Sequence, residues 1–206
     1  MAPPLKVLAL NGTLKPSESG KTSSTDRMID LLMEGFARHG ISGETVRLAD
    51  HQIPPGVTSD EGPGDAWPEI REKIMEADIL IAGTPVWMGQ PSSVIKRALE
   101  RMDAFISEKD SAGRMPSYGK VAAVAVVGNE DGAHHVSAEL FQALNDVGFS
   151  IAPNAVSYWV GEAMSSTDFR DLDEIPETVA SAAKMVVETS AHLARLLTDT
   201  PYPSVK

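Results

Sequence analysis

The sequence of 206 residues contains no cysteine. This absence excludes disulfides, thiolate metal sites, iron–sulfur clusters and a cysteine nucleophile. The five histidines do not suggest a metal site either, because none of them forms the HxxxH or HExxH pattern that binds zinc. We therefore expect neither a bound metal nor disulfide cross-links.

Long apolar runs and positive charge are also scarce. The segment MAPPLKVLAL has too short an apolar run for a signal peptide or a membrane span, so we expect a soluble, cytoplasmic protein. Lysine and arginine number 18 against 29 aspartates and glutamates, which gives a net charge of -11. This charge disfavours nucleic acid and anionic membranes, and we expect neither as a partner.

What the sequence does contain is an alternation of apolar runs with helical patterns. Five runs predict buried strands, over residues 5–10, 42–48, 78–83, 120–128 and 154–161. Apolar residues recur at helical spacing over residues 28–39, 66–77, 95–106, 140–148 and 176–197. Residues 53–65 are rich in proline and glycine and predict a loop without regular structure, and residues 165–177 form a polar connection.

This alternation predicts an α/β fold. Because continuously apolar strands are buried on both faces, we expect a parallel sheet with helices on each side. Five strands favour a doubly wound, flavodoxin-like sheet in the order 2-1-3-4-5. No repeat or linker divides the chain, so residues 1–206 are expected to form a single domain.

In such a sheet a ligand binds at the carboxyl ends of the strands, where the strand order reverses. For the predicted order this place lies between the first and third strands. Three loops rich in glycine, proline and small polar residues are expected to meet there, at residues 11–25, 84–91 and 128–133. The sequence therefore predicts a ligand site among these loops.

The first loop contains Gly20-Lys21-Thr22, which resembles the end of a nucleotide-triphosphate loop. A P-loop needs a glycine five residues before the glycine of GK, but that position is Lys15. The magnesium-binding aspartate is also missing, since strand 78–83 is followed by Thr84-Pro85. We reject an NTPase, and we expect Lys21 to be a surface lysine unless the long loop folds back.

The same loop carries many hydroxyl groups and leads into a helix. Hydroxyls and free amides at a helix N-terminus can bind a phosphate. The helix dipole adds only about 0.3–1 kcal/mol, so hydrogen bonds have to supply most of the binding. The alternative interpretation is an ordinary helix with a serine or threonine N-cap.

The other two loops fit a flat, partly polar ligand. Trp87 and Met88 are expected at the tip of a loop stiffened by two prolines, where they suit the face or edge of an aromatic ring. The alternative is that Trp87 covers the core or an oligomer interface. Amides of the third loop could bind the polar edge of the ring, while His134 and His135 are expected to be surface or packing histidines.

Three segments resemble the NAD(P)H-dependent FMN reductase family of flavodoxin-like proteins. NGT…KTSST resembles the phosphate loop of that family, GTPVWMGQPSSVIKRALERMD its isoalloxazine loop, and VGNEDGAHHV its third flavin loop. The resemblance covers nearly the whole chain. It implies FMN as the cofactor and NADPH or NADH as the hydride donor, without the iron–sulfur chemistry of some relatives.

The resemblance also implies which residues bind the flavin. For the phosphate they are Thr13, Lys15, Ser23, Ser24 and Thr25; for the ring, Pro85, Val86, Trp87, Met88 and Gly89; for its pyrimidine side, Gly128, Asn129, Asp131 and Gly132. No catalytic residue is implied, because the flavin carries the chemistry. Relatives build the flavin pocket across a dimer interface, so we expect a homo-oligomer, either a dimer or a tetramer.

We therefore expect an FMN-dependent NAD(P)H oxidoreductase that passes a hydride to free flavin, a quinone or a similar small acceptor. Two alternatives stay open. One is a flavodoxin-type electron carrier, which the acidic surface also fits; the other is a flavin-free relative used for protein interaction. The isoalloxazine loop and the long loop 53–65 favour the enzyme.

Overall fold

The structure is a computed structural model that describes residues 4–163 and 165–205. Its parallel strands are β1 (Lys6–Asn11), β2 (Ser42–Arg47), β3 (Ile79–Trp87), β5 (Val121–Gly128) and β6 (Ser150–Val160). They are arranged in the order β2-β1-β3-β5-β6, which confirms the predicted order 2-1-3-4-5. The additional strand β4 (Gln90–Pro91) pairs only with β3 and is antiparallel to it.

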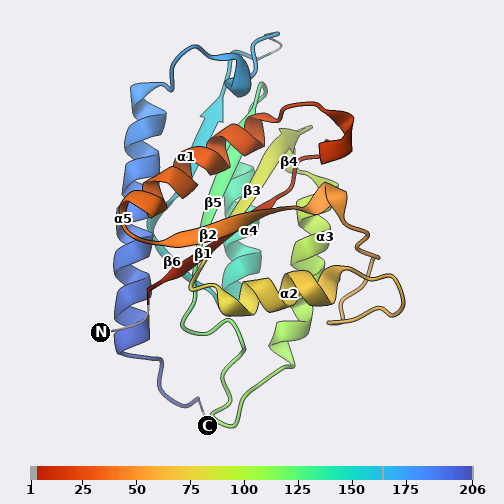
Figure 1. Cartoon of the computed structure of the whole chain (residues 1–206), viewed down its shortest axis with the longest axis vertical. Coiled ribbons are helices and arrows are strands. Elements are labelled where there is room, and N and C mark those ends of the chain that lie inside the picture. The colour runs from red at the N-terminus through yellow and green to blue at the C-terminus, as the bar shows by residue number, and fades with distance from the viewer. Residues whose placement is uncertain (1–3, 164, 206) are drawn as a thin grey trace.

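Helices cover both faces of the sheet, as Figure 1 shows. They are α1 (Ser24–Arg38), α2 (Trp67–Glu76), α3 (Ser93–Met102), α4 (Ala133–Asp146) and α5 (Glu177–Asp199). Helices α1 and α5 pack on one face, and α2, α3 and α4 pack on the other. Neighbouring strand residues alternate between the two cores, as Val7 and Leu8 do in β1. This alternation confirms the doubly wound prediction.

Several predicted elements have wrong boundaries. Ile106, expected to continue the stripe of α3, lies in a short 3-10 helix (Asp103–Ile106) and is 42% exposed, because Phe105 takes the buried position there. Strand β6 begins at Ser150 instead of residue 154. Pro153 and Asn154 resemble a turn in the sequence, but β6 accommodates them where its register with β5 shifts and Asn154 has a φ of 53°.

The second predicted loop is largely a strand. Residues 84–87 continue β3, and only Met88-Gly89 forms the turn to β4. Both turn residues have positive φ, 52° for Met88 and 71° for Gly89, as a two-residue type I′ hairpin requires. Consequently Trp87 lies at the end of a strand rather than on a free loop.

The predicted loop 53–65 contains neither a helix nor a strand, but it is firmly attached. The Arg101 guanidinium of α3 donates to the Asp65 carboxylate at 2.6 Å and to the carbonyl oxygens of Thr58 at 2.9 Å and Pro54 at 3.3 Å. Both side chains of the Arg101–Asp65 pair are fully buried. The loop is therefore held as a fixed part of the fold.

Candidate functional site

A cavity of about 410 Å³ opens at the carboxyl ends of β1, β3, β5 and β6. Its lining consists of Thr13, Leu14, Lys15, Ser23, Ser24, Thr25, Pro85, Val86, Trp87, Val127, Gly128, Asn129, Glu130, Trp159 and Asp168. All three predicted loops contribute to this lining. The volume is in the range of small-molecule pockets, and the position is the switch point at which the sequence placed a ligand.

One end of the cavity is formed by the first turn of α1. Ser23 is the N-cap, and its hydroxyl accepts a hydrogen bond from the Thr25 amide at 3.1 Å. Thr25 is 1% exposed, and its methyl group faces Gly83, where an added side chain would come within 3.3 Å of that methyl. No described residue hydrogen-bonds the Thr25 hydroxyl. A hydroxyl that no described residue uses, in the lining of a cavity, is free to bind a ligand oxygen such as that of a phosphate.

Two further hydroxyls at this end remain able to donate. The Thr13 hydroxyl accepts from the Lys15 amide at 3.3 Å, and the Ser24 hydroxyl accepts from the Arg170 amide at 3.2 Å. A hydroxyl that accepts a hydrogen bond still has its own O–H to offer to a ligand. Four of the five predicted phosphate residues therefore present hydroxyls at one end of the cavity.

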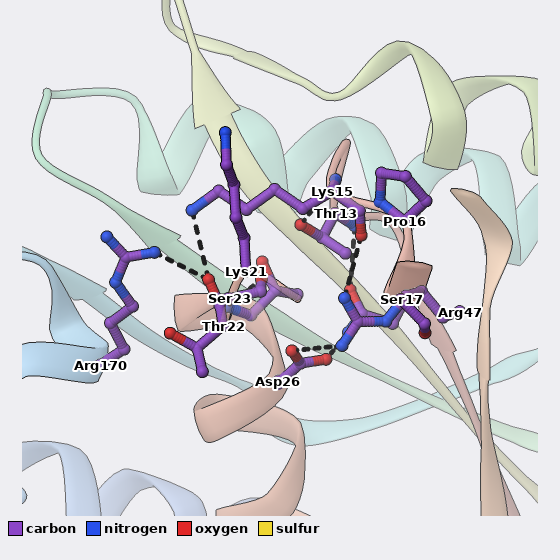
Figure 2. A network of polar contacts seen from close by, with 12 residues as sticks. Thr13, Lys15, Pro16, Ser17, Lys21, Thr22, Ser23, Asp26, Arg47 and Arg170 are labelled. Atoms are coloured by element: carbon purple, nitrogen blue, oxygen red, sulfur yellow. Dashed lines mark hydrogen bonds and ion pairs between the residues drawn. The ribbon is translucent and has the colours of Figure 1, made fainter. Parts of the chain in front are cut away.

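Charges of both signs gather beside this end: Lys15 and Asp168 line the cavity, and Arg170, which pairs with Asp168, lines a neighbouring one. The Lys15 ammonium and the Arg170 guanidinium donate to the same carbonyl oxygen, that of Thr22, at 3.3 Å and 2.7 Å, and Figure 2 shows them converging on it with Lys21 beside them. Burial lowers the pKa of Lys15, and the charges of Arg170 and Lys21 lower it further. Lys21 itself is exposed and does not line the cavity, as expected for a surface lysine.

The loop is tied to the carboxyl end of β2. The Arg47 guanidinium donates to the Lys15 carbonyl at 2.9 Å and pairs with Asp26 of α1 (Figure 2). The Asp50 carboxylate accepts from both the amide and the hydroxyl of Ser17, each at 2.6 Å. These anchors, which the sequence did not suggest, hold Lys15 over α1.

The rest of the cavity is more apolar. Val86 and Trp87 come from β3, Val127 from β5 and Trp159 from β6. A side chain at Gly128 would come within 2.9 Å of the Val86 side chain, so the glycine permits close packing between these strand ends. Trp87 is 50% exposed and does not cover the core. Of the two interpretations of Trp87 as a structural residue, only the oligomer interface is left.

Four predicted residues, Met88, Gly89, Asp131 and Gly132, do not line the cavity. They join the second loop to the third instead. The Met88 amide donates to the Glu130 carboxylate at 2.8 Å, and a side chain at Gly132 would lie 2.9 Å from the Gly89 Cα. The Asp131 carboxylate accepts from the Gly132 amide at 2.7 Å. These residues thus fix the hairpin that carries Trp87.

The two neighbouring histidines have structural contacts. His134 packs edge-on against Tyr158, with 5.1 Å between the ring centroids. His135 Nε2 lies 3.0 Å from Gln90 and 3.0 Å from Glu139. Neither residue lines the cavity, which agrees with the prediction of surface or packing histidines.

Residues 165–172, which we call the strap, cross the cavity edge after β6. The Asn129 side-chain amide donates to the Ser165 carbonyl at 3.2 Å and to the Asp168 carboxylate at 3.0 Å. Phe169 is fully buried against Trp159, with ring centroids 5.5 Å apart. The sequence predicted only a polar connection here, although one phenylalanine among polar residues was a signal for a packed segment.

A larger cavity of about 870 Å³ lies beside the first, along β2 and α2, and shares Ser23 with it. Its lining is dominated by charged side chains, among them Asp30, Glu69 and Lys73. We place the function in the smaller cavity, because it combines a hydroxyl-rich end with an apolar side.

Several known proteins resemble this chain over most of its length. The family model for NADPH-dependent FMN reductase matches residues 5–164. The chain is 36% identical, over 209 residues, to the 8-demethyl-8-aminoriboflavin-5'-phosphate synthase of Streptomyces davaonensis, covering 96% of this chain and 80% of that protein. It is also similar to the crystal structure of RosB with the bound intermediate 8-demethyl-8-formylriboflavin-5'-phosphate, with a TM-score of 0.86 and 34% identity over 96% of this chain and 82% of that one.

A third relative is a much longer protein. The chain is 34% identical over 178 residues to the divalent metal cation transporter MntH of Mycobacterium bovis, covering 82% of this chain but only 26% of that protein. In the described part of the chain no helix is long and apolar enough to cross a membrane. The match to the family model, which covers all three cavity loops, confirms the family that the sequence predicted. This chain belongs to the NADPH-dependent FMN reductase family.

Proposed function

We propose that the protein is an FMN-dependent NAD(P)H oxidoreductase that passes a hydride to free flavin, a quinone or a similar small acceptor. The observation that carries this proposal is the cavity with the unpartnered Thr25 hydroxyl at one end and Trp87 and Trp159 at the other. Bound FMN would supply the hydride chemistry, and the protein would supply binding, orientation and shielding from water.

The residues present fit an FMN phosphate and ring. The phosphate would be bound by the hydroxyls of Thr13, Ser23, Ser24 and Thr25 and by first-turn amides of α1, which lack helical acceptors. The apolar side formed by Val86 and Val127 suits a flat ring. The half-exposed Trp87 leaves the mouth accessible to nicotinamide and acceptor, which must approach the ring to about 3–3.5 Å.

No side chain of the cavity is assigned as a proton donor or acceptor. The protein's contribution is to stack the nicotinamide or the acceptor on the flavin ring in the right orientation. Such positioning can supply much of a rate enhancement. The rigid end of β3 supports this role, since Trp87 is fixed by strand pairing and by the Glu130 contact to Met88. NADPH is the donor named in the family description, and NADH is the alternative.

In a second candidate function, the protein chemically modifies a phosphorylated flavin instead of using it as a cofactor. The 36% identity to an enzyme named for the synthesis of an aminoriboflavin phosphate favours it. The likeness to RosB with a bound formylriboflavin phosphate, at a TM-score of 0.86, favours it as well. In this case the same cavity would hold the flavin phosphate as a substrate rather than as a resident cofactor.

One experiment separates the candidates. The purified protein is loaded with FMN, NADPH or NADH is added anaerobically, and the flavin absorbance is followed. A second sample is incubated with FMN in air with an amino acid as nitrogen donor, because a formyl and then an amino group on the flavin require an oxidant and a nitrogen source, and its flavin is extracted and weighed by mass spectrometry. We expect rapid bleaching and an unchanged flavin mass. A lack of bleaching with both donors would falsify the oxidoreductase, slow bleaching would favour an electron carrier, and an altered flavin mass would favour the second candidate.

A further inference from the structure

The strap lies outside the family match, which ends at residue 164, yet it reaches the phosphate end of the cavity. Asp168 lines the cavity, and the Arg170 amide donates to Ser24 in the first turn of α1. Arg27 of α1 anchors the strap. Its guanidinium donates to three strap carbonyls, those of Phe169 at 2.9 Å, Arg170 at 3.0 Å and Leu172 at 2.6 Å. Arg170 therefore has a fixed position over the amino end of α1.

The Arg170 guanidinium is directed at the residue that precedes the N-cap. One terminal nitrogen donates to the Thr22 carbonyl at 2.7 Å, and the other lies 2.9 Å from the Asp168 carboxylate. The inner nitrogen lies 3.4 Å from Asp171. Each terminal nitrogen carries two N–H groups and uses one of them in these contacts. The remaining N–H groups are available to an anion bound at the first turn of α1.

The surroundings of Arg170 favour such an anion. The Lys15 ammonium donates to the same Thr22 carbonyl, so two cations are held close together (Figure 2). A phosphate monoester carries a charge of about -1.5 to -2 at neutral pH and would attract both cations, whose charges are offset in the free protein by Asp168 and Asp171. A guanidinium is also the side chain best suited to bind two phosphate oxygens at once.

We propose that Arg170 binds the terminal phosphate of the flavin and makes the site selective for phosphorylated flavins over riboflavin. The proposal rests on the proposed function in taking a flavin as the ligand, but it requires no hydride transfer. It assigns binding to a segment that the family match does not include. It also gives the strap a role beyond covering Trp159.

The test compares the binding of FMN and of riboflavin, measured by the quenching of flavin fluorescence without any nicotinamide. The variants are Arg170→Ala, Arg170→Lys and Asp171→Asn, with Arg38→Ala as a matched control at the far end of α1, where Arg38 is exposed and pairs with Glu34. We expect Arg170→Ala to weaken FMN binding roughly 10- to 100-fold, as loss of a hydrogen bond to a charged group does, and to leave riboflavin binding unchanged. Arg170→Lys should restore part of the loss, whereas Asp171→Asn and Arg38→Ala should not weaken FMN binding.

The outcomes discriminate between a binding and a structural role. An equal loss of FMN and riboflavin affinity in Arg170→Ala would mean that Arg170 only positions the strap, and the proposal would be overturned. An unchanged preference for FMN would overturn it too. Inorganic phosphate should compete with FMN in the wild type and compete less in Arg170→Ala. Since these are binding measurements, a protein that binds FMN through Arg170 but oxidises no nicotinamide would contradict the proposed function alone.

Discussion

At the scale of single residues, the two groups of the Thr25 side chain have different roles. The methyl group packs towards Gly83, and the hydroxyl has no partner among the described residues. Ser23 differs, because its hydroxyl already caps α1. A residue whose polar atom does nothing for the free protein is a sensitive place to test ligand binding.

We predict that Thr25→Val weakens FMN binding roughly tenfold or more, since it removes a hydrogen bond to a charged group. The free energy of unfolding without FMN should not fall, because the lost hydroxyl has no partner. Thr25→Ser is the matched control: it should keep FMN binding but lose about 1 kcal/mol of stability with the buried methyl. Isothermal titration and chemical denaturation measure the two quantities, and a stability loss in Thr25→Val would contradict the assignment.

The sequence predicted the hydroxyl residues of the site better than its charged ones. Ser23, Ser24 and Thr25 are consecutive and precede a helical pattern, so local chemistry identifies them. Trp159 was detectable, because the carboxyl ends of parallel strands meet at one edge. Arg170 could not be predicted as a site residue. It lies in a polar segment after the last strand, and no local pattern indicates where such a segment packs.

At the scale of elements, the hairpin between β3 and β4 depends on a glycine in another loop. Gly132 has a φ of 128°, and a side chain there would press on the Gly89 backbone. The hairpin was not predicted from the sequence, because a proline such as Pro85 usually marks the end of a strand. At Thr84 and Pro85, however, β3 no longer pairs with β1 and does not yet pair with β4, so a proline without an N–H is accommodated beside β5.

We predict that Gly132→Ala lowers stability and FMN affinity together, because it displaces the turn next to Trp87. Gly62→Ala is the matched control, since Gly62 has a φ of 102° but nothing within 4 Å of an added side chain. Both variants should lose about 1 kcal/mol or more from the unfavourable backbone conformation. Only Gly132→Ala should weaken FMN binding, measured by fluorescence titration; equal FMN affinity in the two variants would contradict the coupling between the loops.

At the scale of the whole molecule, the buried pair Arg101–Asp65 ties loop 53–65 to α3. Burial by itself would raise the pKa of the Asp65 carboxyl, but hydrogen bonds from Arg101 and from the Glu61 and Trp67 amides lower it below its ordinary 3.8. The folded state therefore favours the ionised carboxylate. This stabilisation is complete above the ordinary pKa and is lost as the pH falls through the lower, folded one.

We predict that Asp65→Asn destabilises the protein by about 3–5 kcal/mol at neutral pH, because it leaves the Arg101 charge buried without its partner. Urea denaturation followed from neutral pH to below 3.8 should show the difference from wild type shrinking in the acid range, since the wild-type carboxylate is then protonated. Asp199→Asn, on the exposed end of α5, should match wild type throughout. A pH-independent difference would contradict this role of the Asp65 charge.

The strand order followed from the sequence because five buried strands alternating with helices leave few chiral arrangements. The association of subunits did not follow from it. Leu14, Trp87 and Met88 are 45%, 50% and 88% exposed around the cavity mouth, which is a large apolar exposure for one region. The homo-oligomer implied by the family resemblance stays a prediction.

The three tryptophans occupy three different settings. Trp67 is fully buried in the first turn of α2 and does not line the cavity, Trp159 lies in the cavity wall, and Trp87 stands at its mouth. A flavin quenches the emission of indole rings that lie beside it. A flavin bound as proposed would therefore lie beside two of the three indole rings, and the quenching of tryptophan emission would report its binding.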